Sequence, residues 1–223
     1  TDTLSGDTSY TVTGSGSGSS GAVNAWQGIE NLTGTTGVDT FTFNGGGSIT
    51  GTASGLAGND VFNLGGAAGG TLSGGDGADT FTLTANSTAT LNGGNDNDSF
   101  ALAGFTLTGA INGNTGITTG SESDTVSGAT TYVGTGAGSG TSPQISGGWS
   151  NIENLTGTSG ADSFTFNAGS SIAGTVSGLA GNDTFSLAGV VNGTLSGGDG
   201  ADTFTLTANA TSTLSGGNDN DTF

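Results

Sequence analysis

The most regular feature of the chain is an alternation of threonine with large apolar residues. It is clearest in Thr40-Phe41-Thr42-Phe43 and in Thr80-Phe81-Thr82-Leu83-Thr84. A period of two with β-branched residues predicts a half-buried strand, with Phe and Leu inward and Thr outward. A second short stretch of this kind, such as Gly70-Thr71-Leu72-Ser73, lies between successive turns. No apolar stripe has the 3.6-residue period of a helix and 48 residues are Gly, so we expect an all-β protein.

The chain contains a long internal repeat. Residues 28–100 align with residues 151–223 at a constant offset of 123, and 55 of these 73 positions are identical. We therefore interpret residues 1–223 as one continuous fragment of a longer repetitive chain. Residues 1–123 form the first unit, and residues 124–223 form an incomplete second unit. Residues 101–150 are the most irregular stretch, and Gly134–Gly140 with Pro143 predict an outward loop there.

A shorter period runs inside each unit. Aspartates close Gly/Asn-rich turns and recur at spacings of 21, 19, 19, 26 and 38 residues, then 21, 19 and 19; they are Asp39, Asp60, Asp79, Asp98, Asp124, Asp162, Asp183, Asp202 and Asp221. Such spacing is typical of stacked coils that cannot bury an apolar face alone. It predicts a parallel β-solenoid with 19–21 residues and two short strands per rung. We expect six rungs per unit, roughly eleven in all at about 4.8 Å each, and one internal phenylalanine ladder through both units.

Composition limits the partners. The chain has 18 Asp and Glu and no Lys, Arg, His, Cys or Met, so its formal net charge is -18. Nucleic acids and anionic membranes are bound through Lys and Arg, so neither is an expected partner, and no apolar run is long enough for membrane insertion. Without His or Cys, zinc and copper sites are not expected.

The turn motif predicts calcium. Gly74-Gly75-Asp76-Gly77-Ala78-Asp79-Thr80-Phe81-Thr82 fits the pattern G-G-x-G-x-D-x-U-x of calcium-binding β-helix repeats. Stacked turns bring like charges about 5 Å apart, where they repel by roughly 1 kcal/mol even in water. Calcium accepts carboxylate and carbonyl oxygens in irregular geometry. The predicted ligands are Asp39, Asp60, Asp76, Asp79, Asp96, Asp98, Asp162, Asp183, Asp199, Asp202, Asp219 and Asp221.

These motifs resemble the RTX-type calcium-binding glycine-rich repeats of secreted bacterial proteins. The match is strong in Gly74–Thr82 and Gly197–Thr205 and poor at Gly120–Asp124, where no ion is expected. Repeats of that type normally follow one another in tandem and load both edges with calcium. Here the motif occurs once per rung and the far side, Ala85-Asn86-Ser87-Thr88, has no acid, so we expect calcium on one edge only. The phrase Ile29-Glu30-Asn31-Leu32-Thr33-Gly34, repeated at Ile152–Gly157, also looks like large secreted adhesins and filamentous surface proteins.

Three classes of function remain open. The first is an extracellular structural repeat on a bacterial surface: a stalk, fibre or sheath segment that calcium rigidifies and that self-associates end to end or laterally into filaments. The second is a module that binds ice or carbohydrate, to which the Thr-x-Thr pairs point. The third is an enzyme, which we do not expect. The pairs of acids recur with the repeat, and such recurrence is typical of a structural scaffold and not of an active site.

Two alternatives concern single features. The aspartate turns can also be read as solvated corners that hold no metal. Trp26 and Trp149 can be read as a sugar-binding surface or, preferably, as side chains packed over a wide rung.

Overall fold

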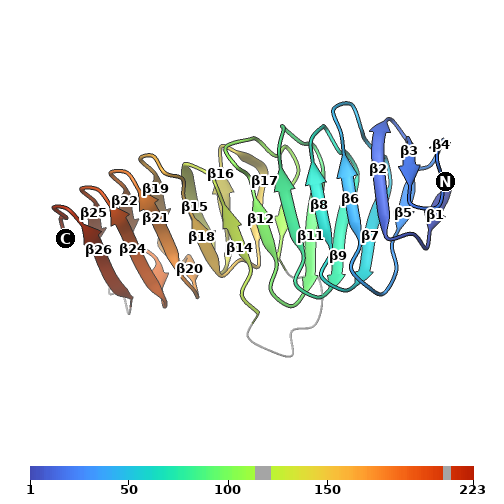
Figure 1. Cartoon of the computed structure of the whole chain (residues 1–223). Coiled ribbons are helices and arrows are strands. Elements are labelled where there is room, and N and C mark those ends of the chain that lie inside the picture. The colour runs from blue at the N-terminus through green and yellow to red at the C-terminus, as the bar shows by residue number, and fades with distance from the viewer. Residues whose placement is uncertain (114–121, 208–211) are drawn as a thin grey trace.

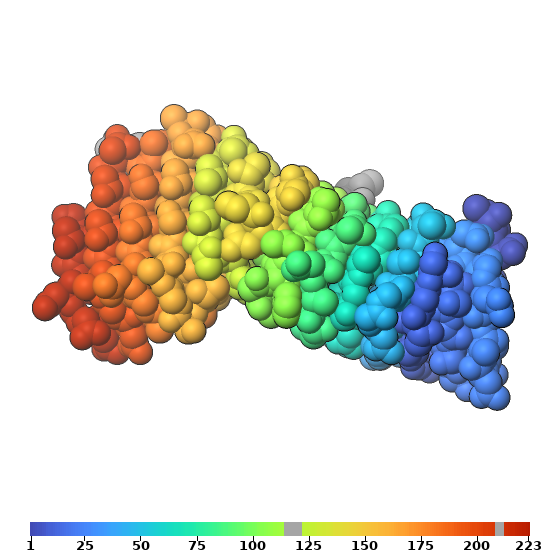
Figure 2. Space-filling model, turned by 90° about the horizontal axis from the view of Figure 1, so that it is seen from above, coloured from blue at the N-terminus to red at the C-terminus, as the bar shows by residue number. Residues whose placement is uncertain are grey.

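The computed structural model describes residues 1–113, 122–207 and 212–223 as a β-solenoid of about nine turns (Figure 1). These residues contain no helix, so none of them forms an apolar helix long enough to span a membrane. The rungs follow one another in chain order along the rod, from blue to red in Figure 2. The predicted all-β parallel solenoid with two short strands per rung is confirmed.

Two twelve-stranded sheets form the long walls of the solenoid. In spatial order, sheet A consists of β1 (Thr3–Ser5), β5 (Asn31–Thr33), β7 (Thr52–Ala57), β9 (Thr71–Asp76), β11 (Thr90–Asn95), β13 (Ile111–Asn112), β17 (Ile145–Ser150), β16 (Ser139–Ser142), β15 (Thr131–Gly136), β19 (Ser163–Phe166), β22 (Thr184–Leu187) and β25 (Thr203–Leu206). Sheet B consists of β26 (Thr213–Asn218), β24 (Thr194–Asp199), β21 (Val176–Ala180), β18 (Asn154–Thr156), β14 (Thr125–Ser127), β12 (Ser99–Ala101), β10 (Thr80–Leu83), β8 (Val61–Leu64), β6 (Thr40–Phe43), β2 (Ser9–Gly14), β3 (Ser17–Ser20) and β4 (Trp26–Gln27). A small third sheet pairs β20 (Ser171–Ile172) with β23 (Val190–Val191).

The apolar positions of the alternating stretches form the core. In β10, for example, Phe81 and Leu83 are fully buried, while Thr80 and Thr82 lie on the outer face. Parallel pairing in register places each buried ring on the ring of the next rung, with centroids 4.6–5.3 Å apart and planes within 13°. Burial of apolar area therefore repeats with the rung and is the main stabilising term of the fold.

The single aromatic ladder expected through both units is wrong. One stack runs along sheet B and the other along sheet A; they are Tyr10–Phe41–Phe62–Phe81–Phe100 and Tyr132–Phe164–Phe185–Phe204–Phe223. Each stack begins with a tyrosine. The hydroxyl of Tyr132 donates a hydrogen bond to the carbonyl of Thr156 (2.8 Å) and accepts one from the amide of Ala129 (3.2 Å).

The break between the stacks comes from a three-stranded insertion. Residues 131–150 do not form the expected outward loop; they form β15, β16 and β17, paired antiparallel within sheet A. Pro143 lies in the tight turn between β16 and β17, where its fixed φ suits a turn. The same insertion in the first unit, β2 to β4, lies in sheet B. These strands occupy sheet positions without completing turns, so the rod has about nine turns and not eleven.

Equivalent strands of successive units are therefore offset by half a turn of the solenoid and lie on opposite walls. From β5 to β17 the chain crosses the two walls eleven times, which is five and a half turns and not the six rungs expected. As a result β5 lies in sheet A, whereas its counterpart β18 lies in sheet B. We call the two narrow sides of the rod the A-to-B edge and the B-to-A edge, after the direction in which the chain crosses them.

Candidate metal site along the acidic edges

A column of inward-pointing aspartates lies under the turns that follow the Gly-rich strands. Asp39, Asp60, Asp79 and Asp98 are all at most 2% exposed. The backbone amide of each donates a hydrogen bond to Oδ1 of the next aspartate along the rod, at 2.7–2.8 Å. Asp162, Asp183 and Asp202 repeat the arrangement in the second unit, with amide-to-Oδ1 distances of 2.7–3.0 Å that end on Asp221. These side chains are thus part of the rung-to-rung bonding and are not solvated corners.

The second carboxylate oxygen, Oδ2, has two different environments. At the first rung of each column it accepts a hydrogen bond from a threonine amide, Thr35 to Asp39 at 2.7 Å and Thr158 to Asp162 at 2.6 Å. In the following rungs Oδ2 is buried and has no hydrogen-bond partner, which applies to Asp60, Asp79, Asp98, Asp124, Asp183 and Asp202. A buried, unpaired carboxylate oxygen is costly unless the group is protonated or an ion lies against it.

A glycine makes room for each inward carboxylate; it stands five residues before the aspartate except at Asp124, where the glycine is Gly113. A Cβ added at Gly74 would overlap Oδ2 of Asp79 and would lie 2.7 Å from the carbonyl oxygen of Gly93. Equivalent overlaps occur for the pairs Gly34/Asp39, Gly55/Asp60, Gly93/Asp98, Gly157/Asp162, Gly178/Asp183, Gly197/Asp202 and Gly216/Asp221. The first glycine of the motif is therefore required by the aspartate and not only by the turn.

Burial raises the pKa of these carboxyls. The pKa of Asp98 rises to about 8 and that of Asp79 to about 7, mainly because desolvation disfavours the charged form. The pKa of Asp60 and of Asp183 rises to about 6 for the same reason. The amide hydrogen bond at Oδ1 opposes these shifts, and neighbouring acids add to them. Without a cation, the interior of each column therefore favours protonated carboxyls near neutral pH.

The four other predicted ligands lie outside the column. All four are exposed: Asp96 and Asp219 on the turns, and Asp76 and Asp199 at the ends of the strands that lead into them. Two of them accept hydrogen bonds of 2.6 Å from the asparagine of the next rung, Asn95 to Asp76 and Asn218 to Asp199. The structure therefore separates the twelve predicted ligands into an inner set and an outer set.

The columns also include acids that the motif did not reveal. The amide of Asp98 donates to Oδ1 of Asp124 (2.7 Å), and the amide of Asp124 donates to Oε2 of Glu153 (2.9 Å), so this column continues through a rung with a poor motif. Glu30 accepts in the same way from the amide of Asp2 (2.7 Å). Gly120 of that poor motif lies outside the described residues. In the sequence, an inward aspartate of the column can be recognised by a glycine five residues before it. That glycine is absent before Asp124, where residue 119 is Thr.

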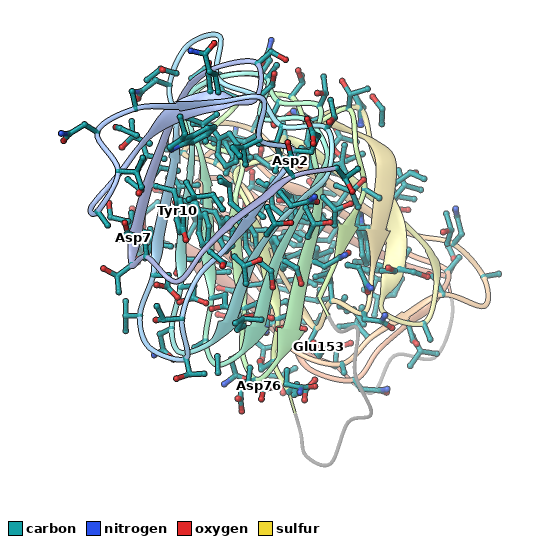
Figure 3. All side chains as sticks on the ribbon, turned by 90° about the vertical axis from the view of Figure 1, so that its right-hand side faces the viewer. Asp2, Asp7, Tyr10, Asp76 and Glu153 are labelled. Carbon is teal, nitrogen blue, oxygen red and sulfur yellow. The ribbon has the colours of Figure 1, made fainter. Side chains whose placement is uncertain are left out.

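The acidic turns do not stay on one edge of the rod. Asp39 to Glu153 lie at the A-to-B edge, whereas Asp162 to Asp221 lie at the B-to-A edge, as does the pair of Asp2 and Glu30. Figure 3 looks along the rod and places Asp2 on the side opposite to Asp76 and Glu153. The expectation of acidic turns along a single edge therefore holds only from Asp39 to Glu153 and again from Asp162 to Asp221, because the repeat is a half-integral number of turns long.

The inner set matches a hard cation in the kind of donors it offers. Oδ2 of Asp79 and the carbonyl of Gly93 both lie next to the same point beside Gly74, and carboxylate with carbonyl oxygen is the donor set that Ca²⁺ prefers. Among the described residues no three acidic side chains are grouped so as to hold a metal by themselves. Backbone carbonyls of the glycine-rich turns would therefore supply part of the coordination.

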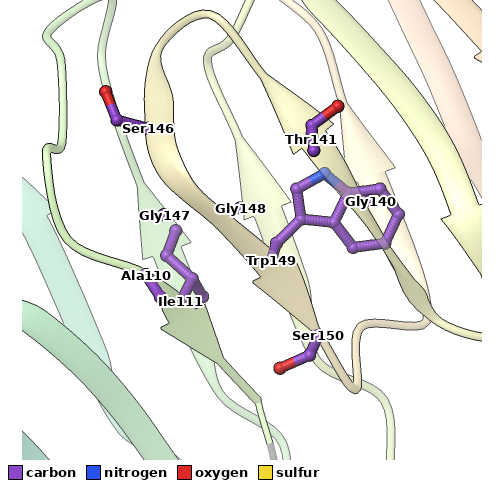
Figure 4. Close-up of a pocket in the computed structure, with 9 residues that line it drawn as sticks. All are labelled: Ala110, Ile111, Gly140, Thr141, Ser146, Gly147, Gly148, Trp149 and Ser150. Atoms are coloured by element: carbon purple, nitrogen blue, oxygen red, sulfur yellow. The ribbon is translucent and has the colours of Figure 1, made fainter.

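A different kind of site surrounds Trp149. A pocket of about 190 Å³ lies between β13 and the inserted strands, lined by Ala110, Ile111, Gly140, Thr141, Ser146, Gly147, Gly148, Trp149 and Ser150 (Figure 4). The indole lies against Gly140, as that of Trp26 lies against Gly18, and both rings are buried. These contacts support the packing interpretation of the tryptophans over a sugar-binding surface.

Comparison with known proteins adds no relative. No protein-family profile matches the chain, and no curated protein sequence matches it.

Proposed function

We propose that the chain is a structural rod segment of an extracellular bacterial surface protein, stabilised by calcium along its acidic columns. The observation that carries this proposal is the column of buried aspartates whose Oδ2 atoms have no partner. The chain has no Lys, Arg or His, so no side chain of its own can neutralise them. An external divalent cation is the remaining way to keep these carboxyls ionised inside the fold.

In this proposal the inner aspartates hold the ion and the glycine carbonyls complete its surroundings. Bound calcium would supply positive charge between rungs. The residues themselves position each carboxylate, since Oδ1 is held by the amide of the preceding aspartate and the glycine leaves space for Oδ2. Because the metal binds the folded turns and not the open chain, its binding free energy adds to the free energy of folding.

The test is a thermal melt followed by far-UV circular dichroism, in millimolar calcium and then in excess chelator at pH 8. We expect a β spectrum whose melting midpoint falls sharply on chelation and is not restored by an equal concentration of magnesium. Calcium titration of the chelated protein by calorimetry should then show several sites per chain. A midpoint that does not change on chelation would contradict the calcium part of the proposal and leave a metal-free rod.

A second candidate function is supported by the outer face of sheet B. Two columns of small, uncharged and mostly hydroxyl-bearing residues run along it; they are Ser9, Thr40, Val61, Thr80, Ser99, Thr125 and Asn154, and Thr11, Thr42, Asn63, Thr82, Ala101, Ser127, Thr156, Ser177, Ser196 and Ser215. The columns repeat every ~4.8 Å along the rod, and within a strand i and i+2 are roughly 6.8 Å apart. A regular array of this kind suits an ice or carbohydrate lattice. Thermal hysteresis in the folded protein, abolished by Thr82→Tyr, would establish it; no hysteresis and no polysaccharide pull-down would reject it.

A further inference from the structure

We propose that rods of this chain associate side by side through the outer face of sheet B, with a second copy of the chain as the partner. The inference rests on the proposed structural function and names the surface that it would use. The distribution of charge around the rod leaves only some of its surfaces free of repulsion between copies.

The acidic groups lie at the turns or, for Asp76 and Asp199, at the last strand position before a turn. Most strand positions that point outward on the walls carry Thr, Ser, Asn, Val, Ala or Gly; the exposed exceptions inside the walls are Gln27, Leu56 and Leu179, none of which is charged. The acids occupy the two edges in alternation along the rod. No copy carries a cationic side chain that could meet the acids of another copy. Edge-to-edge contact therefore brings like charges together, whereas contact between walls does not.

Sheet B offers the larger continuous wall. From β2 to β26 it consists of ten strands in parallel register, and the second column described above continues through all ten. Sheet A is interrupted in its middle by the antiparallel strands β15 to β17, beside the Trp149 pocket.

The area of this wall is sufficient for a specific contact. Ten strands at about 4.8 Å, each on the order of 15 Å long, give roughly 700 Å², close to the ~800 Å² per partner of a standard interface. Small side chains of mixed size, such as Thr82 beside Asn63 and Ala101, leave room for interdigitation with the side chains of another protein face. In a longer array the contact would repeat along the rod, so weak contacts would add.

The experiment compares two double variants that add the same charge to opposite walls. Thr42→Glu with Thr82→Glu places two carboxylates two rungs apart on sheet B. Ser54→Glu with Asn92→Glu places two carboxylates two rungs apart on sheet A. Sedimentation equilibrium of the 223-residue chain is measured over a concentration series in calcium, after circular dichroism has verified that each protein is folded.

We expect the unmodified chain to associate with increasing concentration. The sheet B variant should weaken association at least tenfold, because like charges would face each other across the contact. The sheet A variant should lie within about twofold of the unmodified chain. If a double variant does not fold, the single changes Thr82→Glu and Ser73→Glu give the same contrast. An unmodified chain that stays monomeric at its highest soluble concentration, or two variants with equal effect, would overturn the inference.

Chelation separates this inference from the calcium proposal. If the chain stays folded in chelator and still associates through sheet B, the surface is correct and the calcium role is not. If folding requires calcium but the folded rods do not associate, the reverse holds. Association that disappears on chelation while the fold persists would indicate an ion-bridged edge contact, and it would contradict the sheet B surface.

Discussion

The first aspartate of each column and the aspartates that follow it occupy the same place in the rung but have different surroundings. Asp39 and Asp162 have both carboxylate oxygens hydrogen-bonded, because Thr35 and Thr158 present an amide and a hydroxyl to them. In the next rungs the position of that threonine is occupied by Leu or Gly, whose backbone has a positive φ, as at Leu56 (82°) and Gly75 (126°). The carboxylate there keeps one hydrogen bond and loses the other.

This difference shows which carboxylates of the column the protein leaves without a second hydrogen bond. A column can begin with a threonine-capped carboxylate that is satisfied within the protein. It cannot continue that way, since the backbone amides of the later turns bond to the neighbouring rung, as Gly94 bonds to the carbonyl of Gly113 (2.9 Å). The uncapped aspartates are therefore the proposed metal ligands, and the capped ones are the structural ends.

The largest expected effect is a loss of stability as the pH rises when metal is absent. The folded-state pKa of the uncapped aspartates is raised from 3.8 to about 6, 7 and 8 at Asp60, Asp79 and Asp98. Groups with a raised pKa stabilise the fold while they are protonated, so this stability is complete below about pH 4 and is lost as pH rises through 6 to 8. In chelator, the melting midpoint should fall by about 10 °C or more between pH 4 and pH 8.5.

Calcium should remove or invert that trend, because the ion needs the ionised carboxylate. The measurement is a series of melts at half-unit pH steps with and without the metal. A chelated protein that is equally stable or more stable at pH 8.5 would show that the uncapped aspartates are satisfied in some other way.

The next largest loss of stability should come from adding a Cβ at the glycine that leaves space for an uncapped carboxylate. Gly74→Ala puts a methyl group onto Oδ2 of Asp79 and close to the carbonyl of Gly93, and neither can move without breaking the stacking. We expect the free energy of unfolding to fall by about 3 kcal/mol. Gly45→Ala is the matched control, since nothing lies within 4 Å of its added Cβ. Urea denaturation measures both, and similar losses for the two would show that the carboxylate space is not what Gly74 provides.

Replacing a carboxylate by an amide should change the free energy of unfolding in opposite directions in uncapped and threonine-capped rungs. At pH 8 in chelator, Asp79→Asn removes a buried charge and should stabilise the protein by about 1 kcal/mol. Asp39→Asn leaves one oxygen where the amide and the hydroxyl of Thr35 now have two acceptors, and should destabilise the protein by about 1 kcal/mol. Urea denaturation in chelator checks the signs, and calorimetry checks that Asp79→Asn lowers the number of calcium sites. Equal signs for the two variants would remove the distinction between capped and uncapped rungs.

The smallest effect should come from the capping hydroxyl alone. Thr35→Val keeps the amide of residue 35 but removes the hydroxyl that bonds to Asp39 and accepts from the amide of Gly37 (3.1 Å). We expect a loss of about 1 kcal/mol in the free energy of unfolding. The exposed neighbour Thr36→Val should cost close to nothing. If Thr35→Val is as harmless as Thr36→Val, the amide alone caps the column.

Much of the candidate site was predictable from local pattern. The spacing of the aspartates predicted that they stack in a column, and they do so from Asp39 to Asp124 and from Asp162 to Asp221. What local pattern could not show is that Asp79 turns inward while Asp76 stays outside, since both stand in the same turn. The space beside Gly74 and the amide of Asp60 decide it, and both are contacts between rungs.

The amino-acid sequence by itself determined the rung: its length, its two strands, and which side chains point inward, because a period of two is a local property of extended chain. Only the tertiary structure decided which wall and which edge each unit occupies. That choice depends on the parity of wall crossings, and the parity depends on residues 131–150 pairing into one sheet as three strands. A glycine-rich stretch with weak alternation specifies its register poorly, so its place is decided by the neighbouring strands β13 and β19 that it pairs with.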